Sequence, residues 1–499
     1  MSGLSSFISN IELFDADNNV YLLTHTKGGN NTFSITNTLH NSGFCEYAEP
    51  NFIRVMKLHG ETYQNDQWGI KNIGQYGGIA GNDINVECAW NYTKGNGIRV
   101  AVVDGGMEVT HPDLLANIAG YWSAMDSAAI AQGQGHVHNH NAHGTACAGI
   151  ISAAENGIGI IGVAPQSEFY SVRITKNFGN FGMFEDRFTI AGLKYAWYDA
   201  EADILSCSWG GGNPNLQITA EINNAVTLGR NGKGCIVLFA AGNSNNAVSY
   251  PASLPNVIAV GAISPCGERK RSSSDPNEVS AGVLPDPAGV SCDNKKTWGS
   301  NYGTDLDIMA PGVFISTTDL LGDNGYNTSS ITDDYADNDY TALFGGTSAA
   351  CPYVAGVTAL VLSANSNLTS SQVCNILEST ARKSRQDLYL YSTTVGRPNG
   401  TWHQQMGYGI VDACEAVCAT PLYFTNKTIT TNTTITHCND IYVQNVTINN
   451  ATLTFNTAGN INIQNVTIKN NGKLILDAGG EVNIVSDFDI ELGSELEIR

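Results

Sequence analysis

Short apolar runs alternate with helical stretches along the middle of the chain, and this alternation restricts the fold more than any other feature. The five runs are IRVAVVDGG, EFYSVRI, ADILSCSWG, GCIVLFAAG and NVIAVGAIS. Between them, FTIAGLKYAWYDAEA and LQITAEINNAVTLGRNGKG carry apolar residues at helical spacing, and Gly229 and Gly232 close the second. Near-continuous apolar strands separated by helices form a parallel sheet covered on both faces. The sequence therefore predicts a three-layer α/β domain with a mainly parallel sheet.

The composition indicates a globular chain with more than one core. Of 499 residues, 42% are hydrophobic and 14% are charged, and a single core stops growing near about 250–300 residues. Acidic residues outnumber basic ones 46 to 25, for a formal net charge of -21. This balance argues against nucleic acid and anionic membranes as partners. No apolar stretch approaches the roughly 18–20 residues of a membrane helix, so we expect no transmembrane segment.

The character of the sequence changes twice, which predicts three modules. Residues 1–61 are polar and mixed, residues 62–420 hold the alternating strands and helices, and helices disappear over 421–499. In the tail, IYVQNVTINNATLTFNTAGN is followed by INIQNVTIKNNGKLILDAGG, so that QNVTI recurs after twenty residues, and a looser third copy closes the chain. This period predicts short strands stacked rung on rung. An ordinary β-sandwich is the alternative.

Two polar residues of the middle module stand where sites form. Asp104 ends a buried strand, and ligands bind at the carboxyl ends of strands in open α/β sheets. A buried carboxylate needs strong hydrogen bonds, which a histidine N–H can donate. The alternative is an Asp that caps the turn before Gly105. His143 opens the small-residue helix HGTACAG, which leaves its imidazole at the helix start facing a cleft.

A serine in FGGTSAACPYVAGVTALVL is the candidate nucleophile. Gly345 and Gly346 allow a close approach, Ser348 opens a helix, and Pro352 is expected in the first turn of that helix. A Ser at a helix N-terminus is usually only a cap. Here, however, the helix start can stabilise an oxyanion, and an Asp and a His precede the Ser in chain order. This combination indicates nucleophilic catalysis.

Together these blocks resemble the subtilisin-like serine peptidases, the subtilases, whose chain order is also Asp, His, Ser. The resemblance covers roughly 62–418, from NDQWGIKNIGQ to GYGIVDACEAV. It implies that Ser348 attacks the scissile carbonyl, His143 takes and returns the proton, and Asp104 orients the imidazole. It also implies that Asn243, in LFAAGNSNN, donates its side-chain amide to the oxyanion; otherwise an Asn there belongs to a turn. Such a site needs no cofactor for catalysis.

The specificity of the site is predicted to be broad. In subtilases the segment matching SCSWGGG pairs with the substrate backbone, which implies binding roles for Ser208, Trp209 and Gly210. The wording of this and other motifs is similar to the kexin and furin branch, which cleaves after paired basic residues with acidic pockets. The corresponding carboxylates are missing here, where Gly105 and Asn213 stand. Strict dibasic cleavage is therefore not expected.

The flanking regions resemble accessory modules. SITNTLHNSGFCEYAEPNFIRV is similar to the final helix and strand of a subtilase propeptide, which implies an inhibitory partial propeptide and cleavage between about Asn51 and Trp68. The first residues carry neither a basic n-region nor a long apolar h-region, so either export is not used or the true N-terminus is missing. Because the propeptide resemblance lacks its first half, we expect a truncated start, with a secreted or cell-surface location. The tail resembles β-stack modules that end many surface and secreted proteins of the Bacteroidetes group, which implies a role in export or surface anchoring. A glycan-binding patch and a plain structural cap are the alternatives.

Two groups of potential metal ligands are interpreted as solvated loops. The histidines lack an accompanying Cys or acidic ligand, and the carboxylates lack the spacing of an EF-hand. They are His136, His138 and His140, and Asp333, Asp334, Asp337 and Asp339. No catalytic metal is predicted. Because many subtilases bind calcium, the resemblance leaves room for a structural calcium ion.

The twelve cysteines are not expected to form a disulfide scaffold. Four of them lie in Ala/Gly/Val-rich runs, where a free Cys acts as a small core residue. These four are Cys147, Cys207, Cys235 and Cys351. Cys414, Cys418 and Cys438 are the expected bonded set.

Two functions remain as hypotheses. The first is a serine endopeptidase acting on proteins or peptides, and the second is a catalytically silent surface adhesin that binds through the tail. The presence of Asp104, His143, Asn243 and Ser348 together favours the peptidase, because a silent copy has no physical need of all four.

Overall fold

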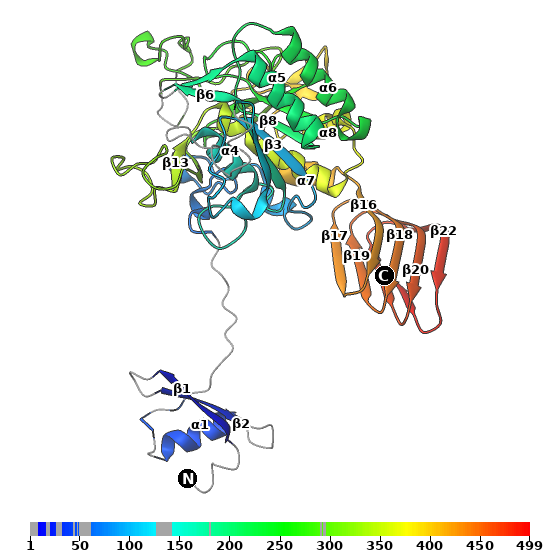
Figure 1. The fold of residues 1–499 in the computed structure, drawn as a ribbon. Coiled ribbons are helices and arrows are strands. Elements are labelled where there is room, and N and C mark those ends of the chain that lie inside the picture. Colours follow the sequence, from blue (N-terminus) through cyan, green and yellow to red (C-terminus); the bar gives the residue numbers. More distant parts are fainter. Residues whose placement is uncertain are drawn as a thin grey trace. The chain divides into compact units, whose positions relative to one another are not determined.

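The structure, a computed structural model, describes residues 8–15, 20–25, 32–42, 45–46, 48, 61–125, 142–178, 181–289, 292 and 296–499 (Figure 1). It divides into two units, Met1–His59 and Gly60–Arg499. In the first unit, β1 (Ile8–Asp15) pairs antiparallel with β2 (Val20–His25), and α1 (Thr32–Asn41) follows. Helix α1 contains the helix expected from the propeptide resemblance. The strand expected after it lies outside the described residues.

A seven-stranded parallel sheet forms the centre of the second unit, in the order β11-β10-β9-β8-β3-β5-β4. Every residue of its inner strands β8, β9 and β10 is buried, so both faces of the sheet are covered. The predicted α/β class with a mainly parallel sheet is confirmed. The strands are β3 (Arg99–Asp104), β4 (Ile118–Ser123), β5 (Glu168–Arg173), β8 (Ile204–Cys207), β9 (Ile236–Ala240), β10 (Ile258–Ile263) and β11 (Ile308–Pro311).

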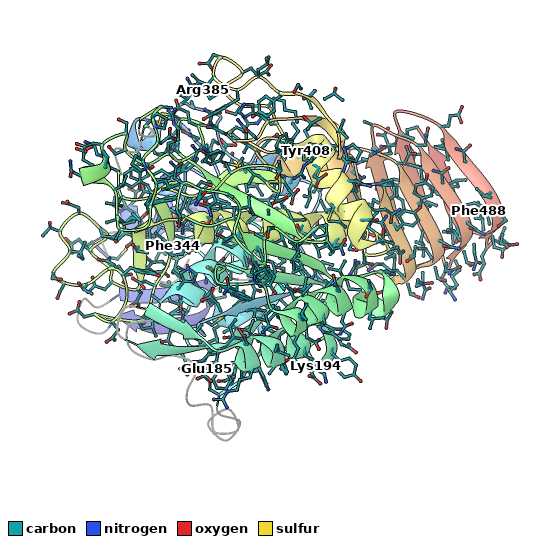
Figure 2. All side chains as sticks on the ribbon, turned by 90° about the horizontal axis from the view of Figure 1, so that it is seen from above. Glu185, Lys194, Phe344, Arg385, Tyr408 and Phe488 are labelled. Carbon is teal, nitrogen blue, oxygen red and sulfur yellow. A yellow bond between two sulfur atoms is a disulfide. The ribbon has the colours of Figure 1, made fainter. Side chains whose placement is uncertain are left out.

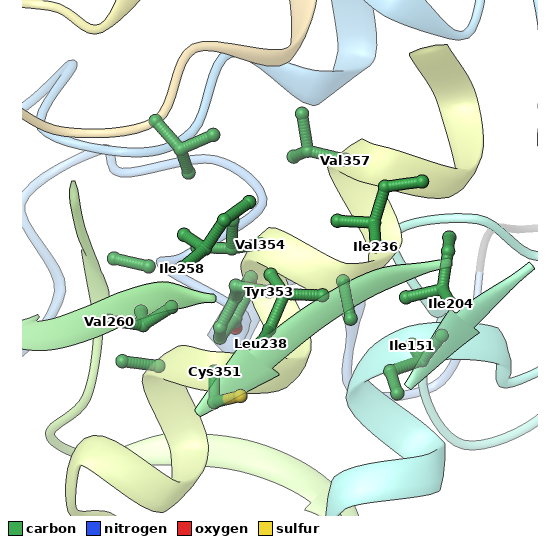
Figure 3. Close-up of a cluster of buried hydrophobic side chains, with 14 of the residues drawn as sticks. Ile151, Ile204, Ile236, Leu238, Ile258, Val260, Cys351, Tyr353, Val354 and Val357 are labelled. Atoms are coloured by element: carbon green, nitrogen blue, oxygen red, sulfur yellow. The ribbon is translucent and has the colours of Figure 1, made fainter. Parts of the chain in front are cut away.

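Two apolar helices, α4 (His143–Ser152) and α7 (Thr347–Ala364), pack on each other and on this sheet. Figure 3 shows Ile204, Ile236 and Ile258 of the sheet gathered beside the α7 side chains of Tyr353 and Val354. By length and composition α7 could cross a membrane, but 89% of it is buried inside the protein, where it forms the core. Helix α4 begins at His143, and α7 begins at Thr347, next to Ser348. The packing of these helices in the core therefore fixes the position of the candidate site.

The remaining helices and strands of this part surround the core. Helices α5 (Asp186–Lys194) and α6 (Leu216–Gly232) pack on each other, and Figure 2 marks Glu185 and Lys194 at the two ends of α5. Strands β12 (Ile315–Thr318) and β13 (Tyr340–Phe344) pair antiparallel beside α4. The others are β6 (Thr175–Phe178), β7 (Phe181–Phe184), β14 (Ser392–Thr394), β15 (Arg397–Trp402), α2 (Val86–Ala89), α8 (Ser370–Thr380) and α9 (Ala413–Cys418).

The tail forms a stack of rungs with its own apolar core, as the repeat predicts. One parallel sheet contains β16 (Leu422–Ile429), β18 (Ile441–Asn449), β20 (Ile461–Lys469) and β22 (Val482–Ile490). The other contains β17 (Thr433–His437), β19 (Thr452–Thr457), β21 (Lys473–Ala478) and β23 (Glu495–Ile498). The β16–β17 rung precedes the first recognised copy, so the stack has one rung more than the repeat indicated.

An asparagine ladder explains why one polar residue recurs in the repeat. Asn426, Asn445 and Asn465 each adopt a positive φ, between 52° and 57°, and Asn tolerates this left-handed conformation better than most residues. The side-chain amide of Asn445 donates to Asn426, and that of Asn465 donates to Asn445, at 2.9 and 2.7 Å. The ladder therefore links successive rungs through side chains as well as backbone.

Disulfides are more numerous than the sequence predicted. The bonds are Cys88–Cys414, Cys266–Cys292 and Cys418–Cys438. The expected set does bond, but Cys414 pairs with Cys88, which is 326 residues away in sequence, and the Cys266–Cys292 bond was not expected. The four core cysteines are free and buried, as predicted.

Candidate active site

Asp104 and His143 form a close pair at the carboxyl end of β3. His143 Nδ1 lies 2.9 Å from Asp104 Oδ1 and 3.0 Å from Oδ2. Gly105 N–H donates to the same carboxylate, which is 5% exposed. The pairing expected from the sequence is therefore present. Because Nδ1 faces the carboxylate, the other ring nitrogen, Nε2, is left to face a reacting group.

Small residues let α4 approach closely enough to form this pair. A Cβ placed on Gly144 would lie 2.1 Å from Gly106 O, in the loop that follows Asp104. One placed on Gly149 would lie 2.3 Å from Thr318 Oγ1 of β12. The Thr317 and Thr318 hydroxyls donate to the Ala146 and Thr145 carbonyls of α4, at 2.6 and 2.8 Å. The glycines are thus required by close backbone packing.

The environment of His143 determines its protonation. Burial alone would lower the pKa of His143, but the adjacent Asp104 carboxylate reverses this effect and holds the pKa well above 6.5. The Phe344 ring packs edge-on against the imidazole, at 5.6 Å between centroids. Cys147 Sγ lies 3.9 Å from Nδ1, and burial raises the pKa of this thiol, so it is neutral near pH 7. The carboxylate is therefore the charged partner of the imidazole.

Ser348 lies in the first turn of α7, as expected. Pro352 was expected in the same turn, but it lies in the second turn. A proline inside a helix cannot donate to the carbonyl four residues earlier, which here is Ser348 O. That carbonyl instead accepts from the Ser208 hydroxyl, at 2.9 Å, and from the Cys147 thiol, at 3.6 Å. The Ser348 hydroxyl donates to Ser208 O at 3.0 Å. The side chains of Ser208, which follows β8 directly, and of Cys147 in α4 thus hold the start of α7.

Asn243 is fixed by its carbonyl oxygen, which orients its amide. Asn243 Oδ1 accepts from Thr347 N at 2.8 Å and from Thr347 Oγ1 at 3.0 Å. Within the described part of the chain, neither Asn243 Nδ2 nor Ser348 N has a hydrogen-bond acceptor. A Cβ placed on Gly346 would lie 3.3 Å from Asn243 Nδ2 and 3.5 Å from Ser348 N. Both donors therefore border one small space that the missing side chain of Gly346 keeps open.

The three residues predicted to bind substrate occupy different environments. Ser208 is 3% exposed, and its side chain is used to hold Ser348. The Trp209 indole donates to Val103 O at 2.8 Å and is half-buried. Gly210 is exposed. Ser208 therefore has a structural contact that the sequence motif did not reveal, because the contact joins residues that are 140 positions apart in the sequence.

The acidic residues before the nucleophile do not converge on a common point. Asp334 accepts from Thr341 Oγ1 and Ala342 N, both at 2.6 Å, and Asp339 accepts from Gly322 N at 2.7 Å. In the described residues, only Asp104, His143 and Cys147 form a group of three potential ligands of the His, Cys, Asp or Glu type. The structure thus agrees with a hydrogen-bonded loop. The histidine tract at 136–140 lies outside the described residues.

Two buried carboxylates that the sequence analysis missed lie near the loop 156–160. Glu61 Oε2 and Asp113 Oδ1 are buried without a hydrogen-bond partner in the described structure. Burial raises the pKa of Asp113 to about 7, although Ile160 N–H and the side chains of Asn156 and Tyr340 oppose this effect. Burial also raises the pKa of Glu61. Neither residue stands in a pattern of ligand spacing, so no sequence signal marked them.

The sheet, the covering helices and the residues at the sheet edge define a subtilisin-like α/β protein. The model of the subtilase family, Peptidase S8, matches residues 95–409, more than half of the chain, and the protein belongs to this family.

Individual relatives support the assignment. The chain is 32% identical over 367 residues to a calcium-dependent protease of a Nostoc species, across 69% of this chain and 50% of that protein. It is 35% identical to thermitase of Thermoactinomyces vulgaris, across 59% of this chain and 85% of the relative. A solved protease structure from Pseudoalteromonas arctica aligns with a TM-score of 0.52 and 25% identity, covering 72% of this chain and 98% of that one. The chain spans about half the length of the calcium-dependent protease.

Proposed function

We propose that this protein is a serine endopeptidase in which Asp104, His143 and Ser348 form the catalytic triad. The observation that carries the proposal is the Asp104–His143 pair at 2.9 Å, with α4 and α7 meeting at Cys147 beside it. Membership of the subtilase family supports the same assignment. Because the match centres on the segment that holds these residues, a purely adhesive role is not favoured.

The geometry supports a two-stage acyl transfer. His143 Nε2 removes the proton from Ser348 Oγ as this oxygen attacks the carbonyl carbon, and Asp104 stabilises the resulting imidazolium. The oxyanion accepts hydrogen bonds from Ser348 N and Asn243 Nδ2. His143 then gives its proton to the leaving amine. In the second stage, water attacks the acyl-enzyme while His143 takes a proton from it, and His143 returns this proton to Ser348 Oγ as the acid product leaves. Before attack, the Ser348 hydroxyl rotates away from Ser208 O toward His143.

We propose broad specificity within this mechanism. Trp209 would form a pocket wall, and the exposed backbone at Gly210 would pair with the substrate. The motifs are similar to those of the kexin and furin branch, but we do not propose its dibasic specificity. Gly105 and Asn213 carry no charge to bind a basic side chain of the substrate. A peptide-library cleavage profile dominated by paired basic residues would contradict this assignment.

The roles of the N-terminal unit and of the tail are proposed from their resemblance to a subtilase propeptide and to a β-stack module. The N-terminal unit would act as a propeptide that blocks the site until cleavage between about Asn51 and Trp68, and the tail would anchor a secreted enzyme to a surface. Persistence of the first residues in the active protein, seen by N-terminal sequencing, would contradict the propeptide role.

A structural calcium ion fits the buried carboxylates better than the acidic loop at 333–339. Asp113 and Glu61 offer oxygen atoms without partners, and oxygen is the ligand atom that calcium prefers. These two residues would hold the ion and gain a counter-charge for their burial. The ion would stabilise the fold and take no part in the chemistry.

Hydrolysis of an unstructured protein such as casein tests the proposal. The mature protein should cleave internal peptide bonds, and Ser348→Ala and His143→Ala should each reduce the rate to near background. Asn243→Ala should lower kcat by about 10²–10³-fold, the loss caused by removing one such donor in a subtilisin. Undiminished cleavage by Ser348→Ala would overturn the assignment.

A further inference from the structure

Asn243 lies in a loop whose backbone has positive φ angles before and after it. Gly242 has a φ of 110° and Asn245 a φ of 49°, on either side of Asn243. Gly adopts a positive φ at little cost and Asn does so more readily than most residues, so the local sequence permits this conformation and contacts with other segments select it. The bonds from Thr347 fix the Asn243 side chain but not the residues that follow it. Gly299 bonds to the backbone of this loop, donating to Asn243 O at 3.3 Å and accepting from Asn245 N at 2.8 Å, and other residues hold the backbone on both sides of Asn243.

Asn301 contacts this loop both before and after Asn243. Its Oδ1 accepts from Ser244 N at 2.9 Å and from Asn246 N at 3.1 Å. Its Nδ2 donates to Ala241 O at 3.1 Å, and its backbone N–H donates to Gly242 O at 2.8 Å. One side chain thus spans the oxyanion residue without touching it.

The fit of Asn301 is close. The residue is 1% exposed, and its Nδ2 also donates to Ser249 Oγ at 3.0 Å, so each polar atom of its side chain has partners. A Cβ placed on Gly242 would lie 2.3 Å from Asn301 Nδ2. The glycine is therefore required both for its positive φ and for the space that Asn301 fills.

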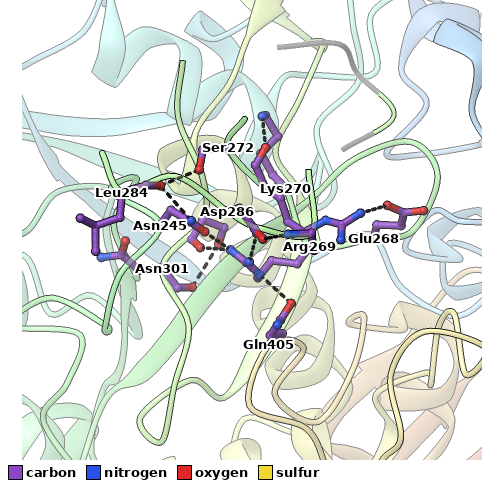
Figure 4. Close-up of polar contacts among 12 residues, drawn as sticks. Asn245, Glu268, Arg269, Lys270, Ser272, Leu284, Asp286, Asn301 and Gln405 are labelled. Atoms are coloured by element: carbon purple, nitrogen blue, oxygen red, sulfur yellow. Dashed lines mark hydrogen bonds and ion pairs between the residues drawn. The ribbon is translucent and has the colours of Figure 1, made fainter. Parts of the chain in front are cut away.

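A second layer supports only the far side of the loop. Arg269 donates to Asn245 Oδ1 at 2.7 Å and pairs with Asp286 at 2.7 Å, as Figure 4 shows. Asn245 Nδ2 donates to Leu284 O at 3.0 Å. These contacts begin two residues after Asn243. Asn301 alone of these side chains bonds to the backbone on both sides.

We propose that Asn301 is a positioning residue that acts through Asn243, keeping its amide aimed at the oxyanion. This inference rests on the proposed oxyanion role of Asn243. Loss of the Asn301 side chain frees Ser244 N and Asn246 N, and the Asn243 backbone can then shift. A displacement of about 1 Å in a catalytic group can cost on the order of 10²-fold in rate. Because the oxyanion forms only after binding, the loss falls on kcat and not on KM.

A double-mutant cycle tests this inference. We expect Asn301→Ala to lower kcat by about 10- to 100-fold, with KM changed by less than about twofold. In the Asn243→Ala background, we expect Asn301→Ala to cause little further loss, because the amide that it positions is already gone. Rates are divided by the concentration of active sites, titrated with a fluorophosphonate. Asn301→Asp, which keeps both acceptors for Ser244 and Asn246, serves where Asn301→Ala does not fold.

The control is Asn72→Ala, at a buried asparagine of another loop. Asn72 is 3% exposed, donates to Pro265 O at 2.9 Å and accepts from Gly74 N at 2.9 Å. We expect its kcat per active site to be unchanged. An equal loss from Asn301→Ala in both backgrounds, or an equal loss from Asn72→Ala, would show a merely structural role and overturn the inference. Unchanged kcat in Asn243→Ala alone would instead refute the oxyanion assignment on which the inference rests.

Discussion

Ser208 and Pro352 provide a test of how the nucleophile is held. Ser208→Ala removes the hydroxyl that donates to Ser348 O at 2.9 Å. Because Pro352 has no N–H, the helix supplies no replacement donor, and only the weaker Cys147 thiol remains, at 3.6 Å. The cost of the substitution should therefore depend on whether residue 352 can donate a hydrogen bond.

The magnitude follows from the loss of one partner of a buried acceptor. Leaving such a group without its donor costs about 1–3 kcal/mol, so Ser208→Ala should lower the free energy of unfolding by this amount. Pro352→Ala restores an N–H four residues after Ser348. In the Pro352→Ala background we therefore expect Ser208→Ala to cost at least about 1 kcal/mol less, well outside the roughly 0.3–0.5 kcal/mol within which independent sites add.

Urea unfolding measures both free energies, in a Ser348→Ala background that keeps the carbonyl and prevents self-digestion. The matched control is Ser171→Ala, at a fully buried serine of β5 whose hydroxyl has no partner in the described structure. Its cost should be the same with Pro352 present or replaced. An identical cost of Ser208→Ala in the two backgrounds would refute the reasoning.

Three further predictions concern the chemistry and the cation. First, the acidic limb of the pH profile of kcat/KM should have its midpoint above pH 6.5, because the base must be neutral and Asp104 raises the pKa of His143. Asp104→Asn should move this limb to lower pH. A wild-type midpoint at or below pH 6.5 would contradict the prediction. Second, EDTA should lower the Tm more at about pH 8 than at about pH 5.5. Burial raises the pKa of Asp113 to about 7 in the folded protein. Without a cation, the free energy of unfolding therefore falls as the pH rises to about 7 and the buried carboxyl ionises. Asp113→Asn should remove that pH difference, and an unchanged Tm after chelation would remove calcium from the account. Third, Gly346→Ala should lower kcat by about 10²-fold, because its Cβ would lie 3.3 Å from Asn243 Nδ2 and φ is 110° there; wild-type kcat would argue against an oxyanion site at that point.

Much of the sheet and the site could be predicted because each signal is local. Asp104 follows a continuous apolar strand, and His143 opens a helix of small residues, so their placement follows from where the two elements end and begin. The repeat likewise predicts the rungs from β18 onward. The first rung was missed because Leu422 pairs with Ile441, nineteen residues on, so the twenty-residue offset does not align it with the later copies.

The missed features are contacts between residues far apart in sequence. Ser208 is identified as a support for Ser348 only once β8 lies beside α7. Cys88 and Cys414 are separated by 326 residues, so their spacing carries no signal. Asp113 and Glu61 become candidate cation ligands only because both are buried near the same loop. Asn301 contacts the Asn243 loop from a separate segment, and its short sequence neighbourhood does not reveal this.

The central claim is that Ser348 is the nucleophile activated by His143 and Asp104. Incubation of the mature protein with a fluorophosphonate, followed by mass spectrometry of its peptides, tests this claim most directly, since a covalent bond to Oγ forms as fluoride leaves only where the serine is activated. We predict one adduct, on the peptide containing Ser348, lost in Ser348→Ala and formed far more slowly in His143→Ala. No adduct on the mature protein, or an adduct that persists in Ser348→Ala, would contradict the account.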